Sequence, residues 1–324
     1  MDCSPVAKVG ILALALAGFS AGACAQAWPS KPLRATVAFT AGSATDIIAR
    51  TLGERLNAQL GQPVVVENRP GASGTIGAAI VARAEPDGYT MLINSSSHTV
   101  APSTFLKLPY DTARDLAGIT PLANLPSVLV IAPSAGVRSV RDLVAAAKAK
   151  PGAMSFASGG VGSAAQLNAE RFRMSAGFDA LHVPFKGAPE ALNEVMTGRV
   201  GFYFCPIVPA LPLVRDGKLL AIAVGSAKRA SALPDVPTTL EAGYADSDYN
   251  FWVGLFVPGK TPRAMVKRIY AETQKAMRST EMSQRMRTLG AESMPMTPEQ
   301  FDAYVREEIA LNAKLVKAAG IKPQ

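Results

Sequence analysis

The chain has 324 residues, of which 48% are hydrophobic and 18% are charged, and its formal net charge is +8. This composition is typical of a packed globular protein and excludes an intrinsically disordered chain. The basic residues are scattered and form no Lys/Arg run, so they indicate a solvated surface and no nucleic-acid partner. Long-range attraction of small anions is compatible with this charge.

Residues 1–25 predict an export signal. Val9–Ala21 is an apolar stretch too short to span a bilayer, and a small-x-small cleavage pattern follows it and ends at Ala25. We therefore expect cleavage after Ala25 and a mature, soluble, periplasmic protein. The alternative is a lipoprotein signal in which Cys24 is lipidated. It is disfavoured because Ala21 stands where a larger aliphatic residue is usual.

The remaining chain is too long for one comfortable hydrophobic core, so we expect two domains. After cleavage Cys205 would be the only cysteine, which excludes an intramolecular disulfide. His98 and His182 have no Cys or acidic neighbours at metal-ligand spacing, so we expect no metal site. No motif indicates a cofactor either.

Apolar strand-like segments alternate with helical patterns along the chain. Leu33–Phe39 is a strand pattern, and residues 48–60 carry apolar side chains at a spacing of four, which is one face of a helix. The same reasoning predicts strands at 64–66, 89–94, 127–132, 154–157 and 181–184, and helices at 75–84, 140–148, 164–174, 188–196, 262–279, 281–289 and 298–319. Such alternation is typical of parallel α/β sheets, whose ligands bind beyond the carboxyl ends of the strands.

Two stretches of the chain have the same pattern, Val37–Ala49 and Met154–Gln166. Each runs from a short apolar segment through Gly and Ser residues into a helical pattern. Such a turn directs several backbone N–H groups, and the positive end of a helix dipole, at one point, which favours an anion. Two copies far apart in the sequence suggest two lobes that close on an acidic solute from opposite sides.

Longer motifs are specific enough to indicate a family. In chain order they are Phe39–Asp46 (FTAGSATD), Val66–Gly77 (VENRPGASGTIG), Ala84–Thr90 (AEPDGYT), Leu108–Asp111 (LPYD), His182–Gly187 (HVPFKG), Leu233–Thr238 (LPDVPT) and Glu241–Tyr244 (EAGY). Together they resemble the Bug-type solute-binding proteins, the extracytoplasmic receptors of tripartite tricarboxylate transporters. The resemblance covers essentially all of residues 28–324.

The resemblance implies a periplasmic binding protein (flytrap) fold, with two α/β lobes joined by two crossing strands. The first lobe is expected to combine residues 26–122 with 226–324, and the second to span 123–225. The crossings would then lie within 119–133 and 219–226. Such a receptor is expected to be a monomer that binds a small carboxylate and delivers it to the membrane permease subunits.

The resemblance also implies how the carboxylate is held, namely by main-chain amides, small hydroxyls and bridging waters, with few charged side chains. In the first lobe Gly42 would permit the turn and Asp46 would cap the helix or order waters. The expected ligand-binding residues are Thr40, Gly42, Ser43, Ala44, Thr45, Asp46, Ser95 and Ser96 (with Ser97 on the same side), and Ser158, Gly159, Gly160, Val161, Gly162, Ser163, Phe185, Lys186, Gly187, Ala188 and Cys205. A bulky residue at Gly159 or Gly162 is expected to abolish binding without unfolding the protein.

Two positions depart from the family pattern. Ser43 stands where a second glycine is usual, so the ligand can differ from common dicarboxylates. Cys205 stands where an acidic residue is frequent, and a neutral thiol cannot pair with an ammonium group, which argues against an amino-acid ligand. Cys205 also fits a small buried side chain, and Lys186 fits an ordinary surface lysine.

Two other functions are compatible with parts of the sequence. Ser95–Ser97 followed by His98 suggests a hydrolase, but adjacent residues rarely give nucleophile–base geometry, and no Gly-x-Ser-x-Gly motif is present. We therefore expect no catalytic residues. A receptor that passes its ligand-bound state to a sensor protein would have the same sequence features as one that serves a transporter.

Overall fold

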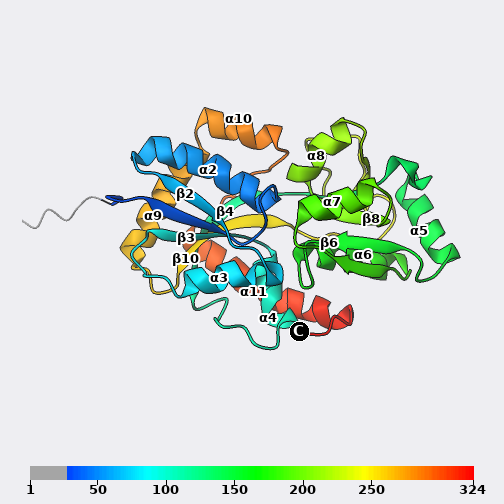
Figure 1. The fold of residues 1–324 in the computed structure, drawn as a ribbon, viewed down its shortest axis with the longest axis horizontal. Helices are drawn as coiled ribbons and strands as arrows, with labels where there is room; N and C mark the ends of the chain where they lie inside the picture. The colour runs from blue at the N-terminus through cyan, green and yellow to red at the C-terminus, as the bar shows by residue number, and fades with distance from the viewer. Residues whose placement is uncertain (1–27) are drawn as a thin grey trace, which may run out of the picture.

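The computed structural model describes residues 28–324 and consists of two α/β lobes that lie side by side along the long axis (Figure 1). The expected signal segment, its cleavage after Ala25 and the alternative at Cys24 fall outside the described residues. Within 28–324, no helix is both long and apolar enough to cross a membrane.

The first sheet has five strands in the order β2-β1-β3-β10-β4. β1 is parallel to β2 and β3, whereas β10 is antiparallel to β3 and β4. Its strands are β1 (Leu33–Val37), β2 (Val64–Asn68), β3 (Thr90–Ser95), β4 (Leu116–Asn124) and β10 (Trp252–Pro258), and its helices are α2 (Ala44–Leu60), α3 (Thr75–Ala82), α4 (Ser97–Thr104), α9 (Arg263–Met277), α10 (Thr280–Thr288) and α11 (Pro298–Ala318), with a short 3-10 turn, η2 (Ala72–Gly74).

The second sheet has the order β7-β6-β8-β5-β9 and the same sequence of directions. β6 is parallel to β7 and β8, whereas β5 is antiparallel to β8 and β9. Its strands are β5 (Ser127–Ile131), β6 (Ser155–Ser158), β7 (Leu181–Pro184), β8 (Phe202–Pro206) and β9 (Leu220–Val224), and its helices are α5 (Val140–Ala149), α6 (Ala164–Ala176), α7 (Ala188–Met196) and α8 (Ile207–Arg215), with the 3-10 turn η3 (Pro133–Ala135).

The expectation of purely parallel sheets is wrong for two strands. β10 in the first sheet is antiparallel to its neighbour β3, and β5 in the second sheet is antiparallel to its neighbour β8. Both follow a passage of the chain from one lobe to the other, and not a βαβ crossover, so alternation of strands and helices does not reveal their direction. The predicted helices and strands otherwise lie where the structure has them, with ends that differ by a few residues.

Several elements carry too little local pattern to be predicted. α4 (SHTVAPST) consists mostly of Ser, His and Thr residues and has Pro102 inside it, and α8 contains Pro212. Both prolines contradict a helical reading of the sequence. β8 and β10 are buried along their whole length, so they lack the alternation that marks a half-exposed strand.

The chain passes between the lobes twice. The first passage lies between β4 and β5, and Leu125 N donates to Phe251 O (2.8 Å) where the two passages run together. The second lies between β9 and β10, and Tyr249 N donates to Gly225 O (2.8 Å). Two short connections in contact are the arrangement expected of a hinge.

Residues 226–249 contact the second sheet, which conflicts with their expected place in the first lobe. Val224 N donates to Pro237 O (2.8 Å), and Arg171 Nε of α6 donates to Asp246 O (2.9 Å). The sequence motif in this segment marks its family but not its contacts. We therefore propose that the second lobe extends to residue 249.

Candidate functional site: facing helix N-termini between the lobes

The loop before α2 holds its shape through its own backbone and one cap. Gly42 has φ +78°, a left-handed conformation that glycine adopts without strain. Ser43 N donates to Thr40 O (3.1 Å), and Asp46 N donates to Ser43 Oγ (3.3 Å), which makes Ser43 the N-cap. Gly42 N in turn donates to Asp46 Oδ2 (3.0 Å). We call residues 40–46 the first-lobe loop.

The loop before α6 repeats this geometry bond for bond. Gly162 has φ +77°, Ser163 N donates to Gly160 O (3.1 Å), and Gln166 N donates to Ser163 Oγ (3.3 Å). Gly162 N donates to Gln166 Oε1 (2.8 Å), just as Gly42 N donates to Asp46. We call residues 158–166 the second-lobe loop. The repeated sequence pattern therefore corresponds to a repeated structure.

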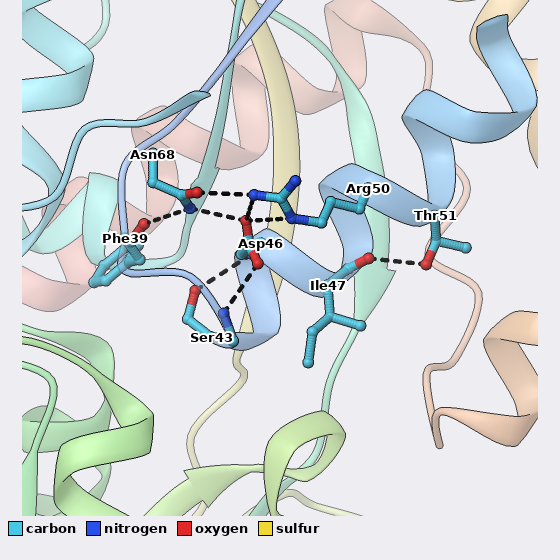
Figure 2. A network of polar contacts seen from close by, with 8 residues as sticks. Phe39, Ser43, Asp46, Ile47, Arg50, Thr51 and Asn68 are labelled. Atoms are coloured by element: carbon cyan, nitrogen blue, oxygen red, sulfur yellow. Dashed lines mark hydrogen bonds and ion pairs between the residues drawn. The ribbon is translucent and has the colours of Figure 1, made fainter. Parts of the chain in front are cut away.

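Asp46 is fully engaged by protein groups. Its Oδ1 accepts from Arg50 Nε (3.0 Å) and Asn68 Nδ2 (2.8 Å), and Asn68 also donates to Phe39 O (3.0 Å) (Figure 2). Burial alone would raise the pKa of Asp46, but the hydrogen bonds from Arg50, Gly42 and Asn68 outweigh it, so the pKa is lowered. Asp46 is therefore an ionised support of the loop, and both of its carboxylate oxygens are engaged by protein groups.

Three amides at the two helix starts have no hydrogen-bond partner among the described residues. They are Ala44 N and Thr45 N of α2 and Ala165 N of α6. The first amides of a helix cannot bond within the helix and carry its positive dipole end. Ser43 and Ser163 already accept a bond from their helices, which leaves their hydroxyl hydrogens to donate. The set provides donors from both lobes and no acidic acceptor.

The two lobes are in contact across this region. Ala164 N of α6 donates to Ser97 Oγ of the first lobe (3.0 Å), and Ser73 Oγ donates to Val161 O (2.5 Å). A Cβ at Gly187 would collide with Thr40, and one at Gly162 would collide with Thr104. Glycines of the second lobe thus allow side chains of the first to approach the backbone, as in a closed form.

A first cavity of about 30 Å³ lies between the two helix starts. It is large enough for about two or three water molecules. No basic or acidic side chain lines it. Its lining residues are Phe39, Ser43, Ala44, Thr45, Ser95, Ser97, Gly159, Ser163, Ala165, Ala188, Tyr203, Pro206 and Phe251.

A second, larger cavity of about 390 Å³ lies next to the first and shares Phe39 and Gly159 with it. Lys186 is the basic residue of its lining. The other lining residues are Thr40, Pro70, Gly71, Ala72, Ser73, Gly74, Gly160, Val161, Phe185 and Gln324.

Of the expected ligand-binding residues, twelve border one of these cavities and seven do not. The first cavity has Ser43, Ala44, Thr45, Ser95, Gly159, Ser163 and Ala188, and the second adds Thr40, Gly160, Val161, Phe185 and Lys186. Gly42, Asp46, Ser96, Ser158, Gly162, Gly187 and Cys205 border neither. Most of these seven belong to the same two loops and support the backbone of those loops without lining a cavity.

Cys205 is fully buried in β8, where it is paired with Val128 of β5. Burial raises the pKa of its thiol, so the thiol is neutral. Its neighbours Tyr203 and Pro206 line the first cavity instead. The alternative reading of Cys205 as a small buried side chain agrees with this placement.

Sequence reasoning missed the aromatic part of the first cavity. Phe39, Tyr203 and Phe251 come from three distant segments, and each reads locally as an ordinary buried residue. Two of them could have been found from their position in the sequence, because Phe39 lies two residues after the end of β1 and Phe251 directly precedes β10. The ends of the strands that face the other lobe meet at the first cavity, so residues next to those strand ends line it.

The serine–histidine arrangement does not have hydrolase geometry. Ser95 Oγ donates to Ser97 Oγ (3.0 Å), while the buried ring of His98 packs on Phe256 with a centroid distance of 4.6 Å. Burial lowers the pKa of His98 to about 4. The hydroxyls that line the cavity therefore have no histidine base beside them.

The other histidine has a structural contact. His182 Nε2 lies 2.6 Å from Ser158 Oγ, its ring stacks on Phe156, and burial lowers its pKa to about 4. Ser158 Oγ also donates to Gly160 O (2.9 Å), so Ser158 and His182 together stabilise the second-lobe loop. Within residues 28–324, no three His, Cys, Asp or Glu side chains are placed to hold a metal ion.

Comparisons with known proteins agree with this geometry. A family model described as the tripartite tricarboxylate transporter family receptor matches residues 48–321. BugT of Bordetella pertussis is 33% identical over 319 residues, which cover 98% of this chain and 98% of BugT. Two solved structures are also similar. Rpa4515 of R. palustris with adipate has 31% identity, a TM-score of 0.88 and coverage of 92% of this chain and 100% of its own. MatC from Rhodopseudomonas palustris with bound malate has 29% identity, a TM-score of 0.84 and coverage of 89% and 100%.

Proposed function

The chain belongs to the tripartite tricarboxylate transporter receptor family, and from this premise we propose that it is a periplasmic receptor for a small carboxylate. It encloses the acid between its lobes and delivers it to the membrane permease subunits of such a transporter. We propose that it acts as a monomer and catalyses no reaction. The observation that carries the proposal is the pair of facing helix N-termini at one cavity between the lobes.

The amides supply the charge that binds the acid. The first cavity has no basic side chain, so a carboxylate there is stabilised by the free amides of Ala44, Thr45 and Ala165 and by two helix dipoles. The hydroxyls of Ser43 and Ser163 donate to the same group. Because both lobes contribute donors, a bound carboxylate favours the closed form over the open one.

Two related receptors support the substrate class. Rpa4515 has been solved with adipate and MatC with malate, and both are similar to this chain over nearly its whole length. Both acids are small aliphatic carboxylates, which matches donors that come from the backbone and from serines.

A thermal-shift screen tests the receptor function. Purified residues 26–324 are melted with a panel of mono-, di- and tricarboxylates, with amino acids and neutral sugars as negative controls. A ligand that binds only the native state raises Tm in a dose-dependent way. We expect a rise with one class of acids and none with sugars, and native mass spectrometry on the same sample identifies any acid retained through purification. An empty protein that responds to no acid would contradict the proposal.

Closure of the lobes is tested at Gly187. Its φ is 178°, which any residue adopts, but a Cβ would collide with Thr40 of the opposite lobe. Gly187→Ala is therefore expected to leave the ligand-free Tm unchanged and to weaken binding about tenfold or more, since overpacking costs about 1–3 kcal/mol. Thr40→Ala in the same chain removes the nearest atoms and should restore part of the affinity. Full affinity in Gly187→Ala would contradict a closed bound form.

A further inference from the structure

A third cavity lies on the first lobe and is separate from the site between the lobes. Its volume is about 280 Å³, and it shares no lining residue with the first and second cavities. Its walls come from β4, the end of α9, α10 and the segment 291–295 that follows α10. Binding of an acid between the lobes gives this cavity no role, so its chemistry calls for an explanation.

Methionine side chains form much of the apolar part of this third cavity. Met277 lies at the end of α9, Met286 lies in α10, and Met294 follows α10. Met286 is buried, and the other two are half-buried. Methionine is flexible and polarizable, so a surface rich in it adapts to apolar side chains and makes favourable contacts with aromatic rings. The third cavity therefore suits a large apolar side chain, above all an aromatic one.

Two arginines give the third cavity a positive rim. Arg278 and Arg287 are exposed, and neither forms an ion pair with a described residue. Glu292 is the one acidic residue among the described residues of the lining, and it already accepts a hydrogen bond from Asn124 Nδ2 (3.2 Å). Arginine binds carboxylates with two parallel hydrogen bonds, and both arginine and methionine are enriched at protein interfaces. The charge of this rim complements carboxylates that flank an apolar side chain.

The wall of the third cavity is connected to the second lobe. Glu292 and Asn124, the last residue of β4 before the first passage between the lobes, exchange two backbone hydrogen bonds of 2.9 Å. Gly290, two residues before Glu292, packs against Ile207 of α8, because a Cβ built on Gly290 would lie 3.0 Å from Ile207 Cδ1. A movement of the second lobe relative to the first therefore changes the wall of the cavity.

We propose that the third cavity is the docking site for an acidic segment of the membrane permease, and that it binds this segment most tightly in the closed, ligand-bound form. A large apolar side chain of the segment enters between the methionines, and carboxylates beside it pair with Arg278 and Arg287. Gly290 and Glu292 make the site sensitive to closure of the lobes. This inference rests on the proposed receptor function and names the surface that meets the transporter.

A labelled peptide tests the proposal. The probe is a fluorescein-labelled peptide in which one Phe is flanked by two Glu on each side, and fluorescence anisotropy measures its binding to purified residues 26–324. In two control peptides, Ala replaces the Phe or Lys replaces every Glu. We expect both controls to bind about tenfold more weakly than the probe. A saturating acid from the thermal-shift screen should tighten binding of the probe about fivefold.

Two results would contradict the proposal at this stage. Equal binding of the three peptides would overturn the docking site. Equal affinity of the probe with and without the acid would overturn the dependence on closure.

Paired substitutions assign the binding to the third cavity. Arg278→Gln combined with Arg287→Gln removes both cations of the rim and should weaken binding of the probe about tenfold. The ligand-free Tm should change little, because both side chains are exposed. Arg138→Gln combined with Arg141→Gln changes two exposed arginines of the second lobe that form no ion pair with a described residue, and this matched control should bind the probe like the wild type. Wild-type binding by the Arg278 and Arg287 variant would show that the assigned site is wrong.

A membrane surface is the alternative partner for an arginine rim. Vesicles of phosphatidylglycerol are tested with the same variants. If the Arg278 and Arg287 variant lost vesicle binding but kept binding of the peptide, the docking site for a protein segment would be overturned.

Titration of acids separates this inference from the receptor function. The Arg278 and Arg287 variant should bind an acid from the screen like the wild type, because the third cavity shares no residue with the site between the lobes. A probe that fails while acids bind would overturn the docking site alone. Failure of every acid with the wild type would contradict the receptor function itself.

Discussion

The first-lobe loop and the second-lobe loop have the same backbone bonds but differ in what supports them and in what they contact. Position 46 is an aspartate held by Arg50 and Asn68, whereas the equivalent position 166 is a neutral glutamine. The first-lobe loop leaves the amides of both Ala44 and Thr45 free. The second-lobe loop uses its first helical amide, that of Ala164, to reach Ser97 of the opposite lobe.

This difference assigns different tasks to the two loops. The first-lobe loop is a rigid anion site that is complete without its partner, so it is the natural place for a carboxylate to bind first. The second-lobe loop adds one free helix-start amide, that of Ala165, and two bonds across the gap, from Ala164 N to Ser97 Oγ and from Ser73 Oγ to Val161 O, so it acts once the lobes close. The same local structure therefore serves initial binding in one lobe and closure in the other.

The largest expected difference between the loops is in stability. Asp46→Ala removes the acceptor of Gly42 N and of Arg50 Nε and one of the two acceptors of Asn68 Nδ2, which we expect to cost about 2–4 kcal/mol. Gln166→Ala leaves only the amide of Gly162 unpaired and should cost about 1 kcal/mol. Denaturant unfolding of the two variants measures this difference. Equal losses would mean that Arg50 and Asn68 add nothing to the first-lobe loop.

The contact between Ala164 and Ser97 should affect binding as well as folding. Ser97→Ala removes the acceptor of a bond that joins the two lobes, so affinity should fall about fivefold, equivalent to about 1 kcal/mol. Because Ser97 Oγ also accepts from the buried Ser95 Oγ (3.0 Å) within the first lobe, the ligand-free Tm should fall as well. Titration of an acid found in the screen measures the affinity, and Ser134→Ala, an exposed serine of the second lobe, is the control. An unchanged affinity would exclude this bond from closure.

The smallest expected effect is a difference in acid response. The pKa of His182, beside the second-lobe loop, is about 4 in the folded protein and about 6.5 when unfolded, so its stabilising contribution is complete above pH 6.5 and is lost as the pH falls to about 4. Asp46 has a lowered pKa, so its contribution is complete above about pH 3.9 and is lost only as the pH falls further.

Tm measured from pH 7 to pH 3 separates the two contributions. His182→Gln should flatten the curve between pH 6.5 and about 4, and Asp46→Asn should flatten it only below about pH 4. The same change in both windows for either variant would contradict this assignment of the two groups.

The two loops were predictable because their chemistry is local. Gly followed by Ser at the start of a helical pattern specifies a left-handed turn and an N-cap within a few residues, and both appear in the structure. The role of Asp46 could be predicted only in part from the sequence. Arg50 lies one helical turn away, but Asn68 approaches from β2, and no local pattern reveals that contact.

The cavity could not be derived from the sequence for the same reason. Phe39, Tyr203 and Phe251 meet only because two sheets bring their strand ends together across the gap. The structure also changes the prediction that a bulky residue at Gly162 would abolish binding without affecting the fold. Its φ is left-handed and a Cβ would collide with Thr104, so a bulky residue there should disturb the loop itself, whereas at Gly159 the expectation of a fold that stays intact stands.

The position of β10 has a consequence for the order in which the chain folds. β10 lies between β3 and β4 in the first sheet, although it follows both by more than a hundred residues in the sequence. As the chain emerges from its N-terminal end, β3 and β4 therefore lack the strand that joins them until residue 258 is available. The second sheet needs no such distant strand and is complete by residue 224. Because contacts between distant residues form slowly, the second lobe should serve as the early folded unit on which the first is completed.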